Sequence, residues 1–369
     1  MTAVRSPLIW IPSLILVLLI GGYTVYWSTL KQDVLDGVAQ WAEDRRADGM
    51  DVSYADANVS GFPFRMDLRI DTLAIADPQH PNKWSWTGEN VDVELNPFRL
   101  TEVDAYFKGQ HRFTFVDSEA ADKTTPNELL STADKARVSL LLGRDKLKNV
   151  YTEIDGWQGL YKAHNAEDYV PVTARKYRMQ VETAPQDPTE RTQTPGPDTL
   201  ENQTMLLQIE ELQLPPGTFP PLGDLISLVE AKTEMRNLPS DFQRADDRDE
   251  ALKRWATNNG SLEIDAMHMM WGDLDLTAEG TLQLDRQYRL KGAVTTLADG
   301  YDAVIDGLVD QGQLDATLAS LIKSALNLIA LTGKDPKGRL RIPLDMRAGG
   351  LYLGPLKLTN LPPLIDDEN

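Results

Sequence analysis

Cysteine is absent from all 369 residues, and its absence excludes disulfide scaffolds, thiol catalysis and thiolate metal sites. Basic residues are also scarce: 37 lysines and arginines stand against 56 aspartates and glutamates, for a formal net charge of −19. Nucleic-acid binding needs basic patches that displace counterions, so this balance argues against a nucleic-acid partner. It also disfavours purely electrostatic attachment to anionic lipids, so any membrane attachment must come from an inserted segment.

The sequence also has little that is typical of an active site. It has four histidines, and none stands at the spacing from glutamate that a zinc-hydrolase helix needs. The G-x-S-x-G motif, a phosphate-binding glycine loop and a dinucleotide fingerprint are absent as well. We therefore expect no enzymatic activity, no cofactor and no metal ion.

Two stretches of the sequence resemble metal-binding motifs. MHMMW, Met267 to Trp271, offers thioether and imidazole groups, but in a strand Met267 and Met269 share one face while His268 lies on the other. We interpret this stretch as core packing. Residues 299–315 are rich in aspartate, but Val304 stands where a calcium loop requires an oxygen ligand. An amphipathic helix with an acidic face fits them better.

One long apolar run stands out near the N-terminus. About 20 uncharged residues extend from Leu8 to Trp27, long enough to cross a membrane as a helix. Trp10 marks one end, and Tyr23 and Tyr26 the other, as interfacial anchoring favours. Arg5 gives a weak charge bias that places the N-terminus in the cytoplasm and the bulk of the chain outside. A cleaved signal peptide is the competing interpretation, but no A-x-A-like site follows the run.

Short alternating segments dominate the remaining chain. An amphipathic helix is expected first, over 31–48, and the segments that follow are separated by turn signals, as in an antiparallel meander. We predict an α+β fold with mainly antiparallel, curved β-sheet and a few amphipathic helices, preceded by one N-terminal transmembrane helix. The strands are expected near 52–59, 62–75, 91–95, 103–116, 138–142, 150–154, 176–182, 205–214, 261–284 and from 339 onward.

Helical spacing recurs in the second half of the chain. Pro221 suits the first turn of a helix, and Leu222, Leu225, Ile226 and Val229 would share one face of it. A charged helix is expected around 241–258, and an apolar helical region with Val304, Ile305, Leu308, Leu318, Leu321, Ile322, Leu326 and Ile329 before Thr332-Gly333.

Length alone allows one large β-rich domain or two smaller ones. We expect a cytoplasmic stub and anchor at 1–30, a β-rich half at 31–183, a Pro/Thr-rich loop at 184–204 and a second β-rich half at 205–369. The halves could also be one continuous domain. WGDLDL at 271–276 and LGPLKL at 353–358 echo one another and suggest a duplicated sheet unit.

The stretch NVSGFPFRMDLRID, residues 58–71, has apolar side chains at every second position. With a period of two, one face carries Phe62, Phe64, Met66, Leu68 and Ile70. Pro63 cannot donate to a sheet ladder, and Gly61 relaxes the backbone beside it, so both are expected at a strand start or bend. That face could be a closed core or a groove that binds an amphiphile, with those five residues as its lining.

Particular residues also resemble a known family. Trp41, Arg45, Arg46, Gly49, Val52 and Tyr54, with the block Val59 to Leu68, resemble an uncharacterised envelope family of Gram-negative bacteria, the domain-of-unknown-function family two-one-two-five. Later blocks at 255–285 and 348–364 are similar to the same family. The resemblance implies an inner-membrane anchor with a periplasmic domain, and no activity. More weakly, the single anchor, the long meander and the G-x-L-x-L at Gly280 resemble AsmA-like lipid-transport proteins.

We therefore expect an inner-membrane protein whose periplasmic part binds phospholipid or another amphiphile on an apolar β face, in envelope maintenance or lipid transport. The alternative is a non-enzymatic scaffold or assembly factor with a closed β core and envelope proteins as partners. A charge placed on the apolar face separates the two hypotheses: it would abolish lipid binding at a groove, but would unfold a closed core.

Overall fold

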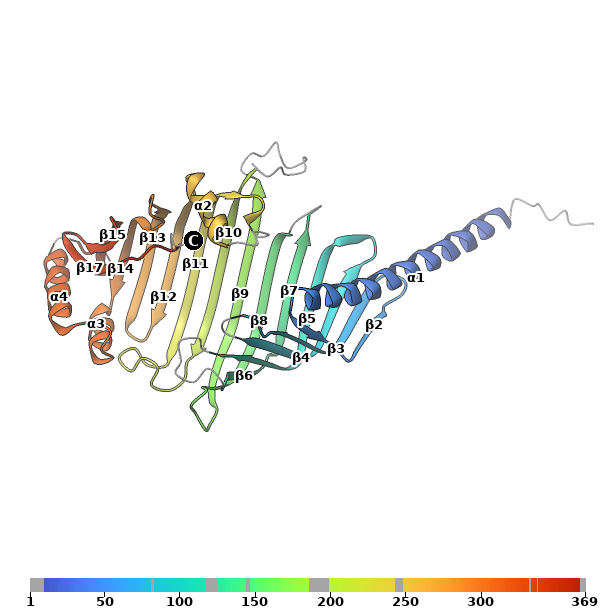
Figure 1. The fold of residues 1–369 in the computed structure, drawn as a ribbon, viewed down its shortest axis with the longest axis horizontal. Coiled ribbons are helices and arrows are strands. Elements are labelled where there is room, and N and C mark those ends of the chain that lie inside the picture. The colour runs from blue at the N-terminus through green and yellow to red at the C-terminus, as the bar shows by residue number, and fades with distance from the viewer. Residues whose placement is uncertain are drawn as a thin grey trace, which may run out of the picture. The chain divides into compact units, whose positions relative to one another are not determined.

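Alternation of polar and apolar residues gives the chain a strand-rich antiparallel fold, as predicted (Figure 1). The structure is a computed structural model that describes residues 10–80, 83–116, 125–143, 147–185, 199–242, 248–331, 333–336 and 338–365. The chain forms two compact units. Unit 1 is Met1–Thr132 with Tyr161–Asp168, and unit 2 is Ala133–Leu160 with Tyr169–Asn369.

Unit 1 combines one long helix with antiparallel strands. β1 and β2 pair with successive parts of β3, β3 pairs with β4, β4 with β5, and β5 with β6. Its elements are α1 (Trp10–Ala47), β1 (Asp51–Ser53), β2 (Asp56–Ser60), β3 (Met66–Asp77), β4 (Trp84–Asn96), β5 (Arg99–Phe115) and β6 (Asn127–Thr132).

α1 is a single helix of 38 residues that contains most of the predicted membrane span and of the amphipathic helix predicted over 31–48. No proline follows Pro12 within it, so nothing forces a break between the two segments. The helix is long and apolar enough to cross a membrane, and the large apolar side chains between Leu14 and Ile20 are exposed. It is therefore compatible with the predicted single span or signal anchor.

The second part of α1 helps to form the core of unit 1. Trp27 and Ala42 are buried in one cluster with Met66, Leu68 and Ile70 of β3. Val34, Leu35 and Val38 pack against the same cluster at helical spacing. The helix is thus an integral part of unit 1 rather than a detachable tether.

Within the residues that the structure describes, unit 2 is a longer antiparallel meander with three helices. β7 pairs with β8, and consecutive strands pair from β9 to β17. Its elements are β7 (Lys135–Leu142), β8 (Leu147–Lys162, its last two residues in unit 1), β9 (Val170–Pro185), β10 (Leu200–Gln213), β11 (Leu225–Pro239), α2 (Arg248–Thr257), β12 (Ser261–Trp271), β13 (Leu274–Leu284), β14 (Leu290–Asp299), α3 (Tyr301–Asp310), α4 (Ala316–Ala330), β15 (Leu340–Arg347), β16 (Gly350–Leu353) and β17 (Leu356–Asn360).

The predicted loop at 184–204 lies mostly outside the described residues. Its two ends belong to β9 and β10, which pair with each other from Glu201 and Pro185 onward. Both strands lie in unit 2, so this loop connects neighbours inside one unit.

α3 and α4 form the apolar helical region that the sequence predicted. Ile305 of α3 and Leu326 of α4 are buried in one cluster with Leu340 of β15 and Leu353 of β16. The Asp315 carboxylate caps α4 by accepting hydrogen bonds from the backbone N–H groups of Thr317 and Leu318. The helices thereby cover one end of the unit 2 sheet.

The helix predicted from Pro221 is wrong, because β11 begins at Leu225. The 222, 225, 226, 229 spacing that suggested a helix also occurs in a strand whose apolar positions are not strictly alternating. Pairing with β10 on one side and β12 on the other satisfies the backbone of Leu225–Pro239 and overrides the local pattern.

The echo between WGDLDL and LGPLKL corresponds to two similar hairpins. Gly272 separates β12 from β13, and Gly354 separates β16 from β17, each as the first residue of a two-residue turn. Both glycines have positive φ, 55° and 58°, as a type II′ turn requires at that position. The repeated residues therefore encode the same tight turn.

Candidate functional site

The five predicted lining residues do not lie on one strand. β3 begins at Met66, and Met66, Leu68 and Ile70 are buried in the unit 1 core. Phe62 and Phe64 lie in the preceding turn, with 50% and 75% of their surface exposed. The strand predicted from residue 62 is therefore too long at its N-terminal end.

Gly61 and Pro63 shape the turn before β3, as expected. Gly61 has φ of 98°, and a Cβ there would lie 2.9 Å from Asp67 Oδ2. The Phe62–Pro63 peptide bond is cis. Only glycine adopts this backbone at no steric cost, and a proline at this place removes no ladder hydrogen bond.

α1 holds this turn through two hydrogen bonds from aromatic side chains, and a third reaches the loop before β5. The Tyr23 hydroxyl donates to the Pro63 carbonyl oxygen, and Trp27 Nε1 donates to the Arg65 carbonyl oxygen at 3.3 Å. The Tyr26 hydroxyl donates to the Pro97 carbonyl oxygen at 2.9 Å. Two loops of unit 1, before β3 and before β5, are thereby fixed to one stretch of the helix.

Ring contacts strengthen the same junction. The Tyr23 ring stacks on Phe98, with centroids 5.7 Å apart. The Trp27 ring meets Phe62 edge to face at 5.4 Å. Such aromatic pairs contribute about 0.5–1.5 kcal/mol beyond their buried area, so the loops and α1 form one structured junction.

Sequence reasoning missed the second of these two loops. The tripeptide Pro-Phe-Arg occurs at 63–65 and again at 97–99, and in both copies a tyrosine of α1 binds the proline carbonyl. Phe98 is 67% exposed, like Phe64 in the first copy. The repeated tripeptide is the signal that could have identified the pair, and we call 63–65 and 97–99 the Pro-Phe-Arg turns.

Unit 2 carries a second feature, a continuous apolar sheet face. Directly paired residues share a face, so the strand registers define which side chains lie together. Three rows cross β9, β10, β11 and β12, and we call them the apolar face: Tyr177–Ile209–Val229–Met269, Met179–Leu207–Ala231–Met267 and Val181–Met205–Thr233–Ile264. Thr233 is the one member of these twelve whose side chain is not largely apolar, and the Tyr177 hydroxyl donates to the Met179 sulfur.

Burial along this face changes from one end to the other. Where α3 and α4 cover it, Ala298 and Leu340 are buried. Over β9–β12 all twelve residues are only half-buried, and of these only Met269 packs against a buried cluster of the described residues. An apolar surface spanning four strands is therefore partly accessible.

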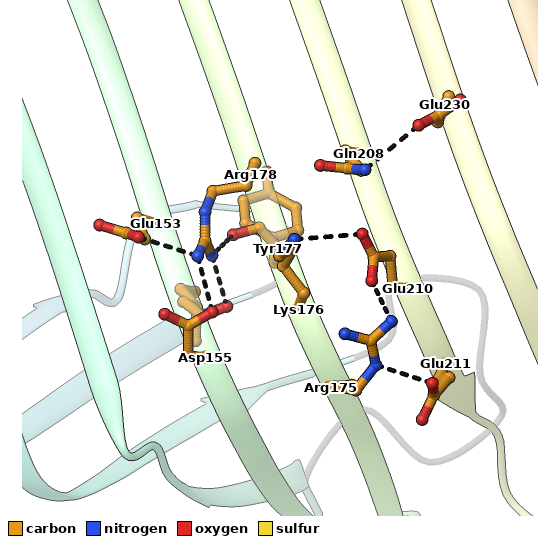
Figure 2. Close-up of polar contacts among 11 residues, drawn as sticks. Glu153, Asp155, Arg175, Lys176, Tyr177, Arg178, Gln208, Glu210, Glu211 and Glu230 are labelled. Atoms are coloured by element: carbon orange, nitrogen blue, oxygen red, sulfur yellow. Dashed lines mark hydrogen bonds and ion pairs between the residues drawn. The ribbon is translucent and has the colours of Figure 1, made fainter.

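The opposite face of the same strands is polar and held by ion pairs (Figure 2). Arg178 Nη2 lies 2.8 Å from Glu153 and 2.7 Å from Asp155, and Lys176 Nζ lies 3.2 Å from Glu210. The hydrogen bond from Lys176 lowers the pKa of the Glu210 carboxyl. Because its charges are paired locally, this face behaves as a solvated surface.

A cavity of about 700 Å³ lies on this polar face. Most of its lining residues, such as Thr295 and Leu297, belong to the polar side by strand alternation. Four residues of the apolar face also border it: Met179, Leu207, Ala231 and Met267. Arg178, Leu206, Lys232, His268 and Arg341 are among its other lining residues. Its size is within the about 300–1,000 Å³ typical of small-molecule sites, but its walls are more charged than such sites usually are.

The MHMMW stretch is split between the two faces, as the sequence predicted. Met267 and Met269 belong to the apolar face, and His268 Nε2 lies 2.9 Å from Asp275 Oδ1 on the polar face. Among the residues that the structure describes, no three histidine or carboxylate side chains are grouped as a metal site would need. The aspartate-rich 299–315 stretch contains α3, as expected.

His111 gives unit 1 a testable pH dependence. Its ring stacks on Trp86 at 5.7 Å, and burial lowers its pKa, although the Glu89 charge opposes the shift. A lowered folded-state pKa means that the unfolded chain binds the proton more readily. Stability is therefore complete above the unfolded pKa of about 6.5 and is lost as the pH falls below it. We expect His111→Phe to remove this dependence, measured as the free energy of unfolding between about pH 7.5 and 5.5.

Comparisons with known proteins give one family match. A family model described as "Uncharacterized protein conserved in bacteria (DUF2125)" matches residues 27–362. The match begins at Trp27, at the aromatic junction, and continues through β17. No curated protein and no solved structure matches the chain.

Proposed function

We propose a function from the geometry and the charge pattern of the chain itself, because the chain belongs to the bacterial family described as uncharacterized (DUF2125) and that description names no activity. In this proposal, α1 anchors the protein in the bacterial inner membrane, and both units lie in the periplasm. It binds phospholipid or another amphiphile on the apolar face of β9–β12, as part of envelope maintenance or lipid transport. We propose binding rather than catalysis.

The half-buried state of the apolar face carries this proposal. Antiparallel sheets commonly bury one face against other elements, as happens where α3 packs on β13 and both α3 and α4 pack on β15 and β16. Over β9–β12 eleven apolar side chains and one threonine remain partly accessible. Apolar patches of this extent on a soluble domain usually mark a binding surface.

An acyl chain fits this surface chemically. It needs apolar contact and no hydrogen bonds, and each methylene removed from water contributes about 0.8 kcal/mol. Methionine supplies Met179, Met205, Met267 and Met269 on the face, and its flexible thioether side chain adapts to ligands of varied shape. The face therefore suits a lipid tail better than a polar metabolite.

The membrane topology is part of the same proposal. Arg5 and the N-terminal amine favour a cytoplasmic N-terminus, and α1 continues from its exposed apolar part directly into the unit 1 core. The AsmA-like resemblance remains a prediction, as does the scaffold alternative, in which protein partners would cover the apolar face.

Photocrosslinking at two adjacent leucines tests the proposal. Both leucines border the cavity, but the strand register places the Leu207 side chain on the apolar face and the Leu206 side chain on the polar face. The full-length chain would carry benzoylphenylalanine at either position in living bacteria, and adducts would be identified by mass spectrometry. We expect lipid adducts at 207 and none at 206.

Each other outcome contradicts the proposal in a different way. Lipid adducts at 206 alone would move the site to the polar cavity. Protein adducts at 207 would support the scaffold alternative, and no adduct at either position would reject the apolar face as a binding surface.

A further inference from the structure

The two Pro-Phe-Arg turns leave most of the surface of their phenylalanine side chains exposed. Phe64 is 75% and Phe98 67% exposed, although both turns are rigidly held by α1. Leu100, directly after the second turn, is 43% exposed. Exposed phenylalanines at two turns held by the same stretch of α1, with Leu100 next to one of them, form apolar surface that a neighbour outside unit 1 could bury.

The position of the turns along α1 identifies that neighbour. Tyr23, Tyr26 and Trp27 hold the turns, and the exposed apolar stretch Leu14–Ile20 ends three residues before Tyr23. At a rise of 1.5 Å per residue, the turns lie about 5 Å beyond that stretch. Tyrosine and tryptophan at the end of a membrane span mark the headgroup level of the bilayer.

Each turn also places an arginine next to its phenylalanine. Arg65 and Arg99 are both largely exposed, and their partners are exposed or partly exposed acidic groups, Asp67 at 3.0 Å and Glu102 at 3.9 Å. Guanidinium groups bind phosphate bidentately and coexist with apolar groups at a membrane surface. Phenylalanine beside arginine is thus suited to lipid tails and lipid phosphates together.

We propose that the two Pro-Phe-Arg turns insert Phe64 and Phe98 into the outer interface of the membrane that α1 crosses, with Arg65 and Arg99 at the phosphates. The inserted turns seat unit 1 directly on the bilayer and fix its orientation. This inference rests on the membrane span in the proposed function and is independent of the apolar face of unit 2.

Depth-dependent quenching tests the insertion in the full-length chain. Because the chain has no cysteine, a single cysteine at 64, 98 or 79 can carry an environment-sensitive fluorophore. The labelled protein would be placed in nanodiscs of phosphatidylethanolamine and phosphatidylglycerol, with and without lipids brominated near the carbonyl end of the acyl chain. We expect loss of fluorescence with brominated lipid at 64 and 98, and none at 79.

Gln79 is a matched control on the same unit. It follows the far end of β3, whose 12 residues place it about 40 Å from the first turn at about 3.4 Å per residue. Its side chain also adjoins Gly49, beyond the other end of α1. Quenching at 79 equal to that at 64 would mean that unit 1 lies against the lipid without a preferred orientation, and would overturn the proposal.

Two further outcomes overturn it separately from the proposed function. Carbonate-resistant membrane association with no quenching at 64 or 98 would keep the anchor and reject the inserted turns. A blue-shifted fluorophore that brominated lipid does not quench would indicate burial against a second copy of the chain. Release of the protein by carbonate would show that α1 does not span the membrane, and it would reject both proposals that depend on the span.

Discussion

Met66→Asp is expected to unfold unit 1, whereas Phe64→Asp, two positions earlier, is expected to leave it folded. The Met66 side chain is fully buried in the cluster that also contains Trp27. A carboxylate without a partner there costs on the order of 5 kcal/mol, comparable with the entire stability of many domains. Phe64 is exposed, so its replacement should change stability by no more than about 0.5 kcal/mol.

Hydrogen exchange of the full-length chain in nanodiscs measures this difference. With Met66→Asp, we expect loss of protection in β3 and in β4, its partner from Leu95 to Trp84. Phe64→Asp should preserve the native protection and is the matched control, because both variants introduce the same charge close together in sequence. Equal protection in the two variants would contradict the placement of Met66 in the core.

The alternation of residues 62–70 predicted the strand but could not locate its beginning. Met66, Leu68 and Ile70 share the buried face as expected. Phe62 and Phe64 continue the pattern in sequence only, because hydrogen bonds from Tyr23 and Trp27 hold the turn away from the sheet. Those partners lie about 40 residues earlier in the chain, and local periodicity contains no information about them.

The same limit explains the error at β11. Leu222, Leu225, Ile226 and Val229 fit a helical period, and neither composition nor capping signals contradicted it. Ladder pairing with β10 and β12 determined the outcome. By contrast α3 and α4 were predictable, because their apolar spacing extends over longer segments and no partner strands compete for them.

Only part of the candidate binding face could be predicted from the sequence. Alternation of Tyr177, Met179 and Val181 with basic and polar neighbours indicated a two-faced strand at β9. The extent of that face depends on how the neighbouring strands are aligned. A bulge between Ile264 and Met267 changes the alignment of β12 and returns Met267 to the apolar side. The residue pattern of one strand does not show how that strand aligns with its neighbours, so the face can be identified only from the strand pairing.

The second large effect is expected at Leu207 and not at Leu206, because the strand register places these neighbours on opposite faces of the sheet. Leu207→Asp should lower the amount of co-purifying lipid at least about tenfold, because a carboxylate in the path of an acyl chain costs well over the 1.4 kcal/mol that a tenfold change requires. Leu206→Asp introduces the same side chain into the same strand but on the polar face, where Leu206 is already 41% exposed. Lipid content should stay unchanged in that variant.

The measurement is the molar ratio of lipid to full-length protein, by mass spectrometry after extraction, with thermal unfolding as the test of folding. The intrinsic cost of aspartate in a strand is common to both variants, so a difference in lipid content isolates the face. Because Leu207 is half-buried, its variant should remain folded, which separates loss of ligand from loss of structure. If Leu207→Asp unfolded the chain while Leu206→Asp did not, the apolar face would be a closed core, and the scaffold alternative would follow.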